Sequence, residues 1–347
     1  MTANREVRET LRTCVGMVIP VWFPEDLSPA HIQESLLSTL DDCDHYLPWE
    51  QVLLVIDGDE RSHRIARDLQ ASCQAHYTSS FDVLYNRENR GKGYAVCLGT
   101  QRLLEKKGVH YLTIRDADGD HALNDLVHLL RLALHLQSAE QTDKLLIIGR
   151  RNHPNRTLGF VRGEYETLLN RVLVEAVCYT LAQQKTVLKT QYFPFSGDAP
   201  DLHSGYKLYS RSICELMVQR PWELSPWVGG EIYRYGVEAV PFVEGALAGA
   251  IVGEITRLTR EARFTGHSGF AKPETNAGVM LWTFLRLGIG PQQGAAILDN
   301  HLSRLTLWTD PRGREDLLQL RRFVLEPLFQ AAQLQPPLPQ VTAGAYF

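Results

Sequence analysis

The chain has 347 residues, of which 44% are hydrophobic and 22% charged, so it can bury a large core and has room for about two domains. Its formal net charge of −4 provides no basic surface for nucleic acid, and its longest apolar run, residues 246–252, is far below the roughly 20 residues of a membrane span. Six cysteines without a C-x-x-C pair and a polar segment at residues 1–12 predict a soluble, cytoplasmic protein with reduced thiols and no signal peptide.

Residues 15 to 149 alternate short apolar runs with helical patterns, an order typical of β-α-β units and a mostly parallel sheet. Ser28 and Pro29 fit the N-cap and the first position of a helix. The predicted strands cover residues 15–19, 52–56, 81–85, 111–114 and 145–149. The helices between them are expected over residues 29–40, around 65–69, from 93 to about 106, and around 126–133.

The second half of the chain is less regular. A long helix is predicted from about residue 161 to residue 183, and two apolar runs, residues 206–209 and 239–242, are predicted to be late strands. From about residue 274 the pattern is helical and ends in a Pro-rich tail. We expect a polar N-terminal segment (1–14), an α/β domain (15–250), a helical C-terminal extension (251–334) and a flexible tail (335–347).

The most informative motif is an acidic pair, Asp116 and Asp118, directly after the predicted strand at residues 111–114. Side chains at positions i and i+2 of an extended segment point to the same side, so the two carboxylates repel each other unless a cation lies between them. A hard divalent ion such as Mg²⁺ or Mn²⁺, bound by oxygen ligands and shared with a diphosphate, meets this need. The pair therefore predicts nucleotide chemistry.

Further charged residues follow other predicted strands. In parallel α/β sheets, ligands bind beyond the carboxyl ends of the strands. The segment Asn89–Gly93 contains two glycines and Lys92 but no P-loop pattern, and we expect it to contact a phosphate or a ribose. The charged residues at the strand ends are Asp57, Asp59, Asp116, Asp118, Arg150 and Arg151.

Taken in order, these motifs resemble the inverting glycosyltransferases of family 2, which have a GT-A fold. The chain is most similar to the branch that includes the polyprenyl-phosphate mannosyl- and glucosyltransferases, over roughly residues 15 to 245. The resemblance implies an α/β, Rossmann-like nucleotide-diphospho-sugar transferase fold with a mixed, mostly parallel sheet, followed here by the helical extension. The matching segments are residues 18–21 with Glu25, 55–59, 89–93, 116–121, 149–151 and 201–207.

The resemblance also implies a donor substrate and a set of ligands. The donor would be a nucleotide diphosphate sugar, carrying UDP or GDP, with Asp57 near the base or ribose and Lys92 on the nucleotide side. The implied nucleotide-sugar contacts are Pro20, Glu25, Asp57, Asp59, Lys92, Asp116 and Arg151. The implied ligands of Mg²⁺ or Mn²⁺ are Asp116, Asp118 and Asp120.

The chain departs from the family pattern at the acceptor side. Arg151 and Arg162 match arginines that bind an acceptor phosphate in the polyprenyl-phosphate enzymes. Glu166, however, falls where a small hydroxyl residue is usual, and its carboxylate would repel a phosphate. The expected acceptor is therefore either a hydroxyl compound or a lipid-linked compound met at a membrane surface.

Glu231 is the candidate general base, because an acceptor hydroxyl must lose a proton as it attacks. Relatives usually have Asp-x-Glu where this chain has Gly229, Gly230 and Glu231, so one acidic residue of that pattern is missing. Lys207 is expected to hold an acidic side chain or a substrate oxygen.

A few other residues have weaker functional interpretations. His203 and His267 are singled out among the histidines. For His267 the reason is that a late histidine completes the metal site in some retaining GT-A enzymes. An aromatic cluster could form a wall against which a sugar stacks, although buried aromatic residues more often pack the core. Its members are Trp222, Trp227, Tyr233 and Tyr235.

The sequence therefore predicts a metal-dependent, inverting glycosyltransferase, and two other classes stay open. A non-catalytic nucleotide-sugar-binding protein of the same fold would keep the donor residues and lack turnover. A sugar nucleotidyltransferase would need a Gly-rich stretch after the first strand, where this chain has Pro20, Val21, Trp22 and Phe23.

Overall fold

The structure of the chain is a computed structural model that describes residues 2–152, 159–193, 199–224, 231–258 and 271–335. The described residues form one seven-stranded sheet with the strand order β3-β2-β1-β4-β6-β5-β7. Strand β6 runs antiparallel to both of its neighbours, and the other pairs are parallel. The strands are β1 (Val15–Val21), β2 (Val52–Asp57), β3 (Asp82–Asn86), β4 (Tyr111–Ile114), β5 (Leu145–Arg150), β6 (Lys207–Ser210) and β7 (Ile251–Thr256).

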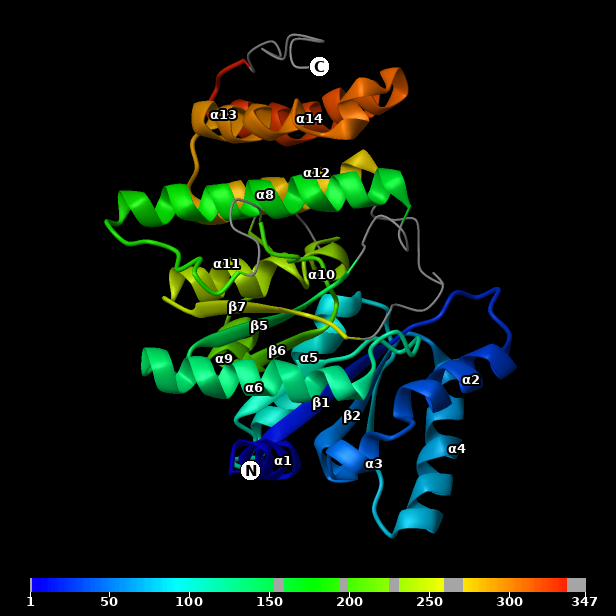
Figure 1. The fold of residues 1–347 in the computed structure, drawn as a ribbon. Coiled ribbons are helices and arrows are strands. Elements are labelled where there is room, and N and C mark those ends of the chain that lie inside the picture. Colours follow the sequence, from blue (N-terminus) through cyan, green and yellow to red (C-terminus); the bar gives the residue numbers. More distant parts are fainter. Residues whose placement is uncertain (1, 153–158, 194–198, 225–230, 259–270, 336–347) are drawn as a thin grey trace.

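Helices cover both faces of this sheet (Figure 1). One face packs against α6 and the segment from α1 to α4, and the other against α5, α9 and α11. The α-helices are α1 (Thr2–Cys14), α2 (Pro29–Leu40), α3 (Cys43–Tyr46), α4 (Glu60–Tyr77), α5 (Lys92–Leu104), α6 (Leu123–Glu140), α8 (Phe160–Gln183), α9 (Arg211–Gln219), α10 (Glu231–Tyr235), α11 (Ala239–Leu247), α12 (Pro273–Leu287), α13 (Pro291–Leu302) and α14 (Pro311–Ala331).

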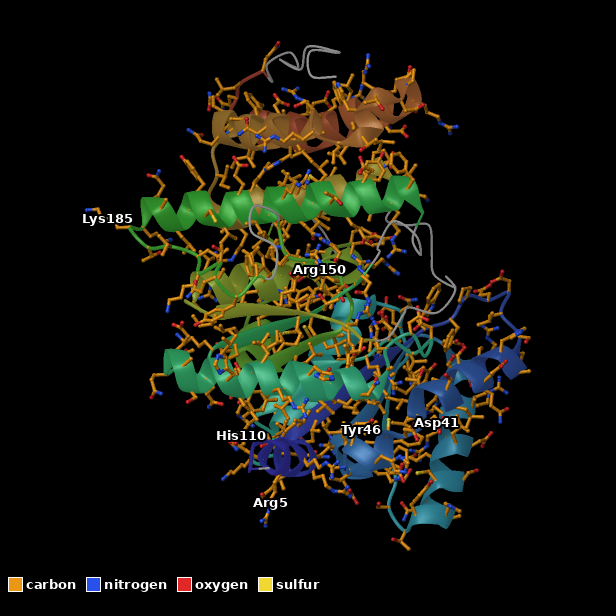
Figure 2. All side chains as sticks on the ribbon, in the orientation of Figure 1. Arg5, Asp41, Tyr46, His110, Arg150 and Lys185 are labelled. Atoms are coloured by element: carbon orange, nitrogen blue, oxygen red, sulfur yellow. The ribbon has the colours of Figure 1, made fainter. Side chains whose placement is uncertain are left out.

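The central strands β1 and β2 are buried along their whole length, as expected for parallel strands covered on both sides. In β1, Met17 and Ile19 point into the core beneath α6, whereas Val18 points into the opposite core beneath α5. Side chains fill the space between the layers (Figure 2). This packing fixes the β1 and β4 ends, and with them the residues that follow.

The predicted start of the first β-α-β unit is confirmed. Ser28 is the N-cap of α2, its side-chain oxygen accepts a hydrogen bond from the His31 N–H, and Pro29 is the first helical residue. Ile32, Leu36 and Leu40 form the buried face of α2. Local sequence alone therefore determines this helix and its direction of packing.

The prediction of a strand at residues 239–242 is wrong, because these residues begin α11. A short apolar run cannot distinguish a buried strand from a buried helix, and Pro241 lies in the first turn, where the missing N–H has no cost. The late strand predicted at residues 206–209 is present as β6.

The region after residue 250 is more closely joined to the sheet than a separate helical extension would be. Strand β7 pairs in parallel with β5, so the sheet continues to Thr256. Beyond it, α12 packs against α8 and α14 (Figure 1). Trp282 and Phe284 of α12 belong to the same core as the sheet residues Leu146 and Ile148.

The N-terminal segment predicted as polar is the helix α1, which buries Val7 and Leu11. The flexible tail predicted after residue 335 lies outside the described residues. No helix in the described part of the chain is long and apolar enough to span a lipid bilayer.

Candidate functional site

The residues that follow β4 form a tightly held turn, residues 115–121, which we call the acidic turn. Arg115 is buried, and its guanidinium donates hydrogen bonds to the carbonyl oxygens of His121 (2.6 Å) and Thr39. The Asp116 N–H donates to Nδ1 of His121 at 3.2 Å. These bonds fix the turn from inside, so that Asp116 is held at the carboxyl end of β4, as the sequence predicts.

Lys92 and Glu238 lie next to the acidic turn. Nζ of Lys92, the first residue of α5, lies 2.8 Å from Oδ1 of Asp116 and 3.3 Å from Oε1 of Glu238. Burial opposes the charge of Lys92, but the carboxylates of Asp116 and Glu238 raise its pKa above the ordinary value. Burial likewise opposes the charge of Asp116, but Lys92 lowers its pKa. Both residues are therefore charged at neutral pH.

The charge of the second acid of the pair, Asp118, is less well compensated than that of Asp116. Burial and the nearby charge of Asp116 raise the pKa of Asp118, and two groups partly oppose this rise: the Asp120 N–H, which donates to Oδ1 of Asp118 at 3.2 Å, and the charge of Lys92. Two neighbouring carboxylates that repel each other fit a hard divalent ion. No group of three acidic, histidine or cysteine side chains in the described residues is arranged to hold a metal, so the set of Asp116, Asp118 and Asp120 stays a prediction.

Gly205, in the segment before β6, packs against the acidic turn at Asp116 and His121. A Cβ at this position would lie 2.8 Å from Oδ2 of Asp116 and 3.1 Å from Cε1 of His121. The next residue, Tyr206, stacks on the His121 ring with centroids 4.7 Å apart and an angle of 4° between the planes. Because residue 205 has no side chain, the segment before β6 can lie directly against Asp116. This close contact restricts the orientation of the Asp116 carboxylate.

Asp57, at the end of β2, organises the loop of residues 86–91. Its side chain is 2% exposed, and its Oδ2 accepts the N–H groups of Gly91 (2.7 Å) and Arg90 (3.1 Å). Its Oδ1 accepts the side-chain amide of Asn86 at 2.8 Å. The structure thus places Asp57 beneath the loop, and its contact with a nucleotide base or ribose stays a prediction.

Three other residues that were predicted to contact the nucleotide sugar lie near the carboxyl ends of β1 and β2. Asp59 is the N-cap of α4, where it accepts hydrogen bonds from the Arg61 N–H (3.1 Å) and from the Ser62 hydroxyl (2.5 Å). Pro20 lies inside β1 and is buried, whereas Glu25 is exposed in the segment after β1. Asp59 therefore has a clear role in starting α4.

The candidate base Glu231 is brought to the 86–91 loop by α10. Arg234 of α10 donates to Oδ1 and the backbone oxygen of Asn89, at 3.1 and 3.2 Å. Gly91 allows this approach, since a Cβ there would lie 2.8 Å from Cα of Arg234. Glu231 is the first residue of α10, is 73% exposed, and lies 3.5 Å from Nε of Arg234. The base candidate is thus accessible to a substrate.

The aromatic residues near α10 pack the structure together. Trp222 is buried and stacks on Tyr233, with ring centroids 5.0 Å apart. Gly93 makes room for the indole, because a Cβ there would lie 2.4 Å from Cζ3 of Trp222. Trp222 therefore joins α5 to α10 and is not exposed for stacking on a sugar. Trp227 and His267 lie outside the described residues.

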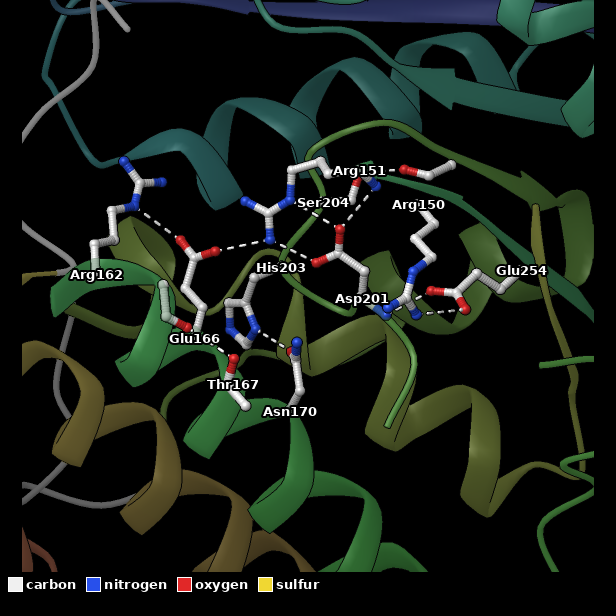
Figure 3. A network of polar contacts seen from close by, with 12 residues as sticks. Arg150, Arg151, Arg162, Glu166, Thr167, Asn170, Asp201, His203, Ser204 and Glu254 are labelled. Carbon is white, nitrogen blue, oxygen red and sulfur yellow. Dashed lines mark hydrogen bonds and ion pairs between the residues drawn. The ribbon is translucent and has the colours of Figure 1, made fainter. Parts of the chain in front are cut away.

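A second polar cluster follows β5, and Figure 3 shows its contacts. Arg151 is 5% exposed, and its guanidinium binds both oxygens of Asp201, at 2.5 and 2.8 Å. The same guanidinium lies 2.7 Å from Oε2 of Glu166, whose Oε1 lies 2.8 Å from Nε of Arg162. Burial favours the neutral carboxyl, but Arg151 lowers the pKa of Asp201 to about 2. Glu166 thus joins two arginines that the sequence analysis assigned to an acceptor phosphate.

The cluster extends toward β7 and α8. Arg150 lies 3.3 Å from Glu254, which also accepts the Asp201 N–H at 2.6 Å. On the other side, Nδ1 of His203 is 2.6 Å from Oδ1 of Asn170 (Figure 3). We call this cluster the arginine network. Its members are Arg150, Arg151, Arg162, Glu166, Asn170, Asp201, His203 and Glu254.

Lys207 lies on β6 between the two clusters and is buried. Its ammonium donates to the carbonyl oxygen of Ser204, and burial lowers its pKa to about 8. The sequence analysis expected an acidic partner or a substrate oxygen for Lys207. The carboxylates of Glu238 and Asp201 oppose the effect of burial on its pKa, while its hydrogen bond goes to a backbone oxygen.

The site contains residues that sequence analysis did not identify. Glu238, which pairs with Lys92, lies 146 positions away in the chain. Gly205 was part of a recognised segment, but its closeness to Asp116 depends on the pairing of β6 with β4. Neither contact has a local sequence pattern that would have revealed it.

Comparison with known proteins shows similarity to solved structures. No protein-family model and no curated protein matches the chain. Its fold is similar to the mannosyltransferase PcManGT from Pyrobaculum calidifontis in complex with GDP-Man and Mn²⁺, with a TM-score of 0.50 and 12% sequence identity. The match covers 94% of this chain and 89% of that one. It confirms the predicted α/β fold with a mixed, mostly parallel sheet, a fold that this chain shares with a glycosyltransferase.

Proposed function

We propose that the chain is a metal-dependent, inverting glycosyltransferase that uses a UDP- or GDP-sugar. The observation that carries this proposal is the acidic turn, where Asp116 and Asp118 form a pair of interacting carboxylates at the carboxyl end of β4. Ligands bind at this edge of parallel sheets, and the neighbour in fold was solved with GDP-Man and Mn²⁺. Resemblance to family 2 supports the same assignment.

In this proposal, Asp116, Asp118 and Asp120 hold Mg²⁺ or Mn²⁺, and Lys92 lies on the nucleotide side. The ion, when bound, stabilises the negative charge that develops on the departing diphosphate. The acceptor oxygen forms a bond to the anomeric carbon while the bond from that carbon to the diphosphate oxygen breaks. The electron pair of the broken bond leaves with the diphosphate, and the acceptor proton passes to the Glu231 carboxylate.

The arginine network supports an acceptor that offers an uncharged hydroxyl. Arg151 and Arg162 are already paired with Glu166, and Arg151 also binds Asp201 through both carboxylate oxygens. An anionic acceptor at this place would have to displace or approach buried carboxylates, which is costly. A hydroxyl acceptor also fits the exposed Glu231, because an already ionised phosphate needs no base.

A non-catalytic nucleotide-sugar-binding protein is the second candidate. The pattern before Glu231 lacks its usual acidic residue, and a protein that had lost turnover would keep the acidic turn unchanged. A sugar nucleotidyltransferase has less support, since residues 20–23 replace the Gly-rich stretch it would need. We further propose that the protein acts in the cytoplasm, which the absence of disulfides among its six described cysteines supports.

The test is thermal stability against a panel of UDP-, GDP- and dTDP-sugars, with Mn²⁺ and with chelator. A ligand that binds only the folded protein raises the free energy of unfolding by about 2.7 kcal/mol at a hundredfold excess over its Kd. A shift for one nucleotide sugar that chelator abolishes supports the proposal, and no shift with any donor contradicts it. Release of the free sugar or its transfer then separates the enzyme from the binding protein.

A further inference from the structure

The ammonium group of Lys92, a cation of the chain itself, lies against the acidic turn. Nζ of Lys92 lies 2.8 Å from Oδ1 of Asp116, and the two side chains are each 30% exposed. The carboxylate of Asp116 therefore has a charged partner that is largely shielded from water. A divalent ion that uses Asp116 as a ligand must compete with this ammonium, since both are attracted to the same carboxylate.

Lys92 also has a second partner to which it can move. Glu238 is buried ahead of α11, and its Oε1 lies 3.3 Å from Nζ of Lys92. Within the described residues, the other oxygen of Glu238, Oε2, is buried and accepts no hydrogen bond. A buried carboxylate oxygen without a donor is costly, so a closer approach of the ammonium to Glu238 would satisfy it.

We propose that Lys92 takes the place of the metal ion at Asp116 in the metal-free protein, and that a divalent ion displaces its ammonium from Asp116 toward Glu238. This inference rests on the proposed metal site of Asp116 and Asp118. The displacement breaks one ion pair and strengthens another, so no charge is left unpaired in either state. Lys92 acts as a positioning residue, because it moves between Asp116 and Glu238 and makes Asp116 available only when a stronger cation is present.

The test is the affinity of the nucleotide-free protein for Mn²⁺, measured by calorimetry and by electron paramagnetic resonance. In Lys92→Met the ion no longer has to displace an ammonium, so Mn²⁺ binds about tenfold more tightly than in the wild type. A simple phosphate-binding lysine would leave this nucleotide-free affinity unchanged. Lys92→Arg, which keeps the charge, binds Mn²⁺ within about twofold of the wild type.

Arg90→Met is the matched control for net charge. Arg90 lies on the neighbouring loop, with its guanidinium 3.8 Å from the centroid of the Tyr94 ring, and its removal changes the net charge by the same amount as Lys92→Met. We expect a change in Mn²⁺ affinity of less than about twofold, because long-range charge effects are screened at ordinary ionic strength.

Glu238→Gln tests the second partner. With a weaker alternative partner, Lys92 stays on Asp116, and Mn²⁺ binds about threefold more weakly than to the wild type. In the Lys92→Met background the same substitution has no effect, because no ammonium remains to be moved. An equal effect in both backgrounds would show that Glu238 acts on the ion directly and would overturn the exchange.

Two outcomes must be kept apart. If Asp118→Ala binds Mn²⁺ like the wild type, the proposed metal site is wrong, and this inference is wrong with it. If Asp118→Ala loses the ion but Lys92→Met binds no more tightly than the wild type, only the exchange is overturned. Should Lys92→Met fail to fold, Lys92→Gln gives the same comparison, with circular dichroism as the check on folding.

Discussion

Two polar clusters lie at the carboxyl edge of one sheet, and they differ in how their charges are compensated. In the arginine network, Arg151 is enclosed by Asp201 and Glu166, and its side chain is 5% exposed. In the acidic turn, Asp116 is paired with Lys92, whereas the pKa of Asp118 is raised by burial and by the charge of Asp116. Buried charges that are fully paired serve the fold, whereas a carboxyl group with a raised pKa at the edge of a sheet is a candidate for ligand binding.

The difference assigns the two clusters separate roles, one in folding and one in ligand binding, and the segment before β6 connects them. The segment from Asp201 to Tyr206 contacts the arginine network at its beginning and the acidic turn at its end, where Gly205 lies against Asp116. The bonds of Asp201 to the arginine network therefore help to fix the position of Gly205 beside Asp116. If this is correct, substitutions in the two clusters will affect different measurements.

The largest expected effect is on folding. Arg151→Ala removes the shared partner of Asp201 and Glu166. It leaves the buried Asp201 carboxylate without this partner and Glu166 with Arg162 alone, which costs about 3–5 kcal/mol. Urea denaturation measures this loss in the free energy of unfolding. The control is Arg102→Ala, which removes an ion pair with Glu105 whose side chains are 52% and 60% exposed, and which we expect to cost less than about 1 kcal/mol. Equal costs for the two variants would contradict a structural role of the network.

The next effect is on ligand binding. Asp118→Ala removes a carboxyl group whose charged form is disfavoured by burial and by Asp116, so the protein stays folded and loses metal-dependent donor binding by about a hundredfold, or roughly 2.7 kcal/mol. Calorimetry with the donor and Mn²⁺ measures this loss. Asp68→Ala, at an exposed position of α4, should leave the affinity unchanged. Unchanged affinity in Asp118→Ala would falsify the site.

Gly205→Ala tests the close contact between the segment before β6 and Asp116. The new methyl group would lie 2.8 Å from Oδ2 of Asp116, and this carboxylate is the end of a side chain that can rotate away. We expect Mn²⁺ affinity to fall about tenfold while stability changes by less than about 1 kcal/mol. The control is Gly278→Ala in α12, where a Cβ meets no atom within 4 Å and the helix tolerates the change. A larger loss of stability than of Mn²⁺ affinity would assign Gly205 to packing alone.

Local patterns were sufficient for much of the fold and for part of the site. Ser28, Pro29 and the apolar spacing predict α2, and the apolar run at 111–114 followed by Asp116 predicts an acidic strand end. Residues 239–242 were assigned to a strand because a run of four apolar residues has no detectable helical period.

The remaining features depend on contacts between distant parts of the chain. The pairing of Lys92 with Glu238 joins residues 146 positions apart, and Glu166 meets Arg151 only when α8 packs beside the end of β5. Asp57 has the residue type and position of a ligand-binding acid, yet its oxygens are bonded to the 86–91 loop. Sequence can identify a carboxylate at the rim of a sheet, but only the fold shows which partner it has.

The smallest effect is a dependence of stability on pH that comes from the arginine network. Burial lowers the pKa of His203 from 6.5 to about 4, so the folded protein keeps this imidazole neutral where the unfolded chain binds a proton. Stability from this residue is therefore lost as the pH falls from 6.5 toward 4, by roughly 1 kcal/mol between pH 6.5 and about 5.5. The charged groups that act on His203 are Glu166 of α8, Glu238 ahead of α11, Lys207 of β6 and Arg151 after β5.

Urea denaturation of the wild type and His203→Gln at both pH values measures this contribution. Because glutamine does not titrate and can still bond to Asn170, the variant should show a smaller loss of stability on acidification, by the same roughly 1 kcal/mol. Donor affinity at constant Mn²⁺ should be equal in the two proteins at each pH. A matching change in donor affinity would mean that the arginine network and the acidic turn act as one site, and the separation of the two clusters would then be wrong.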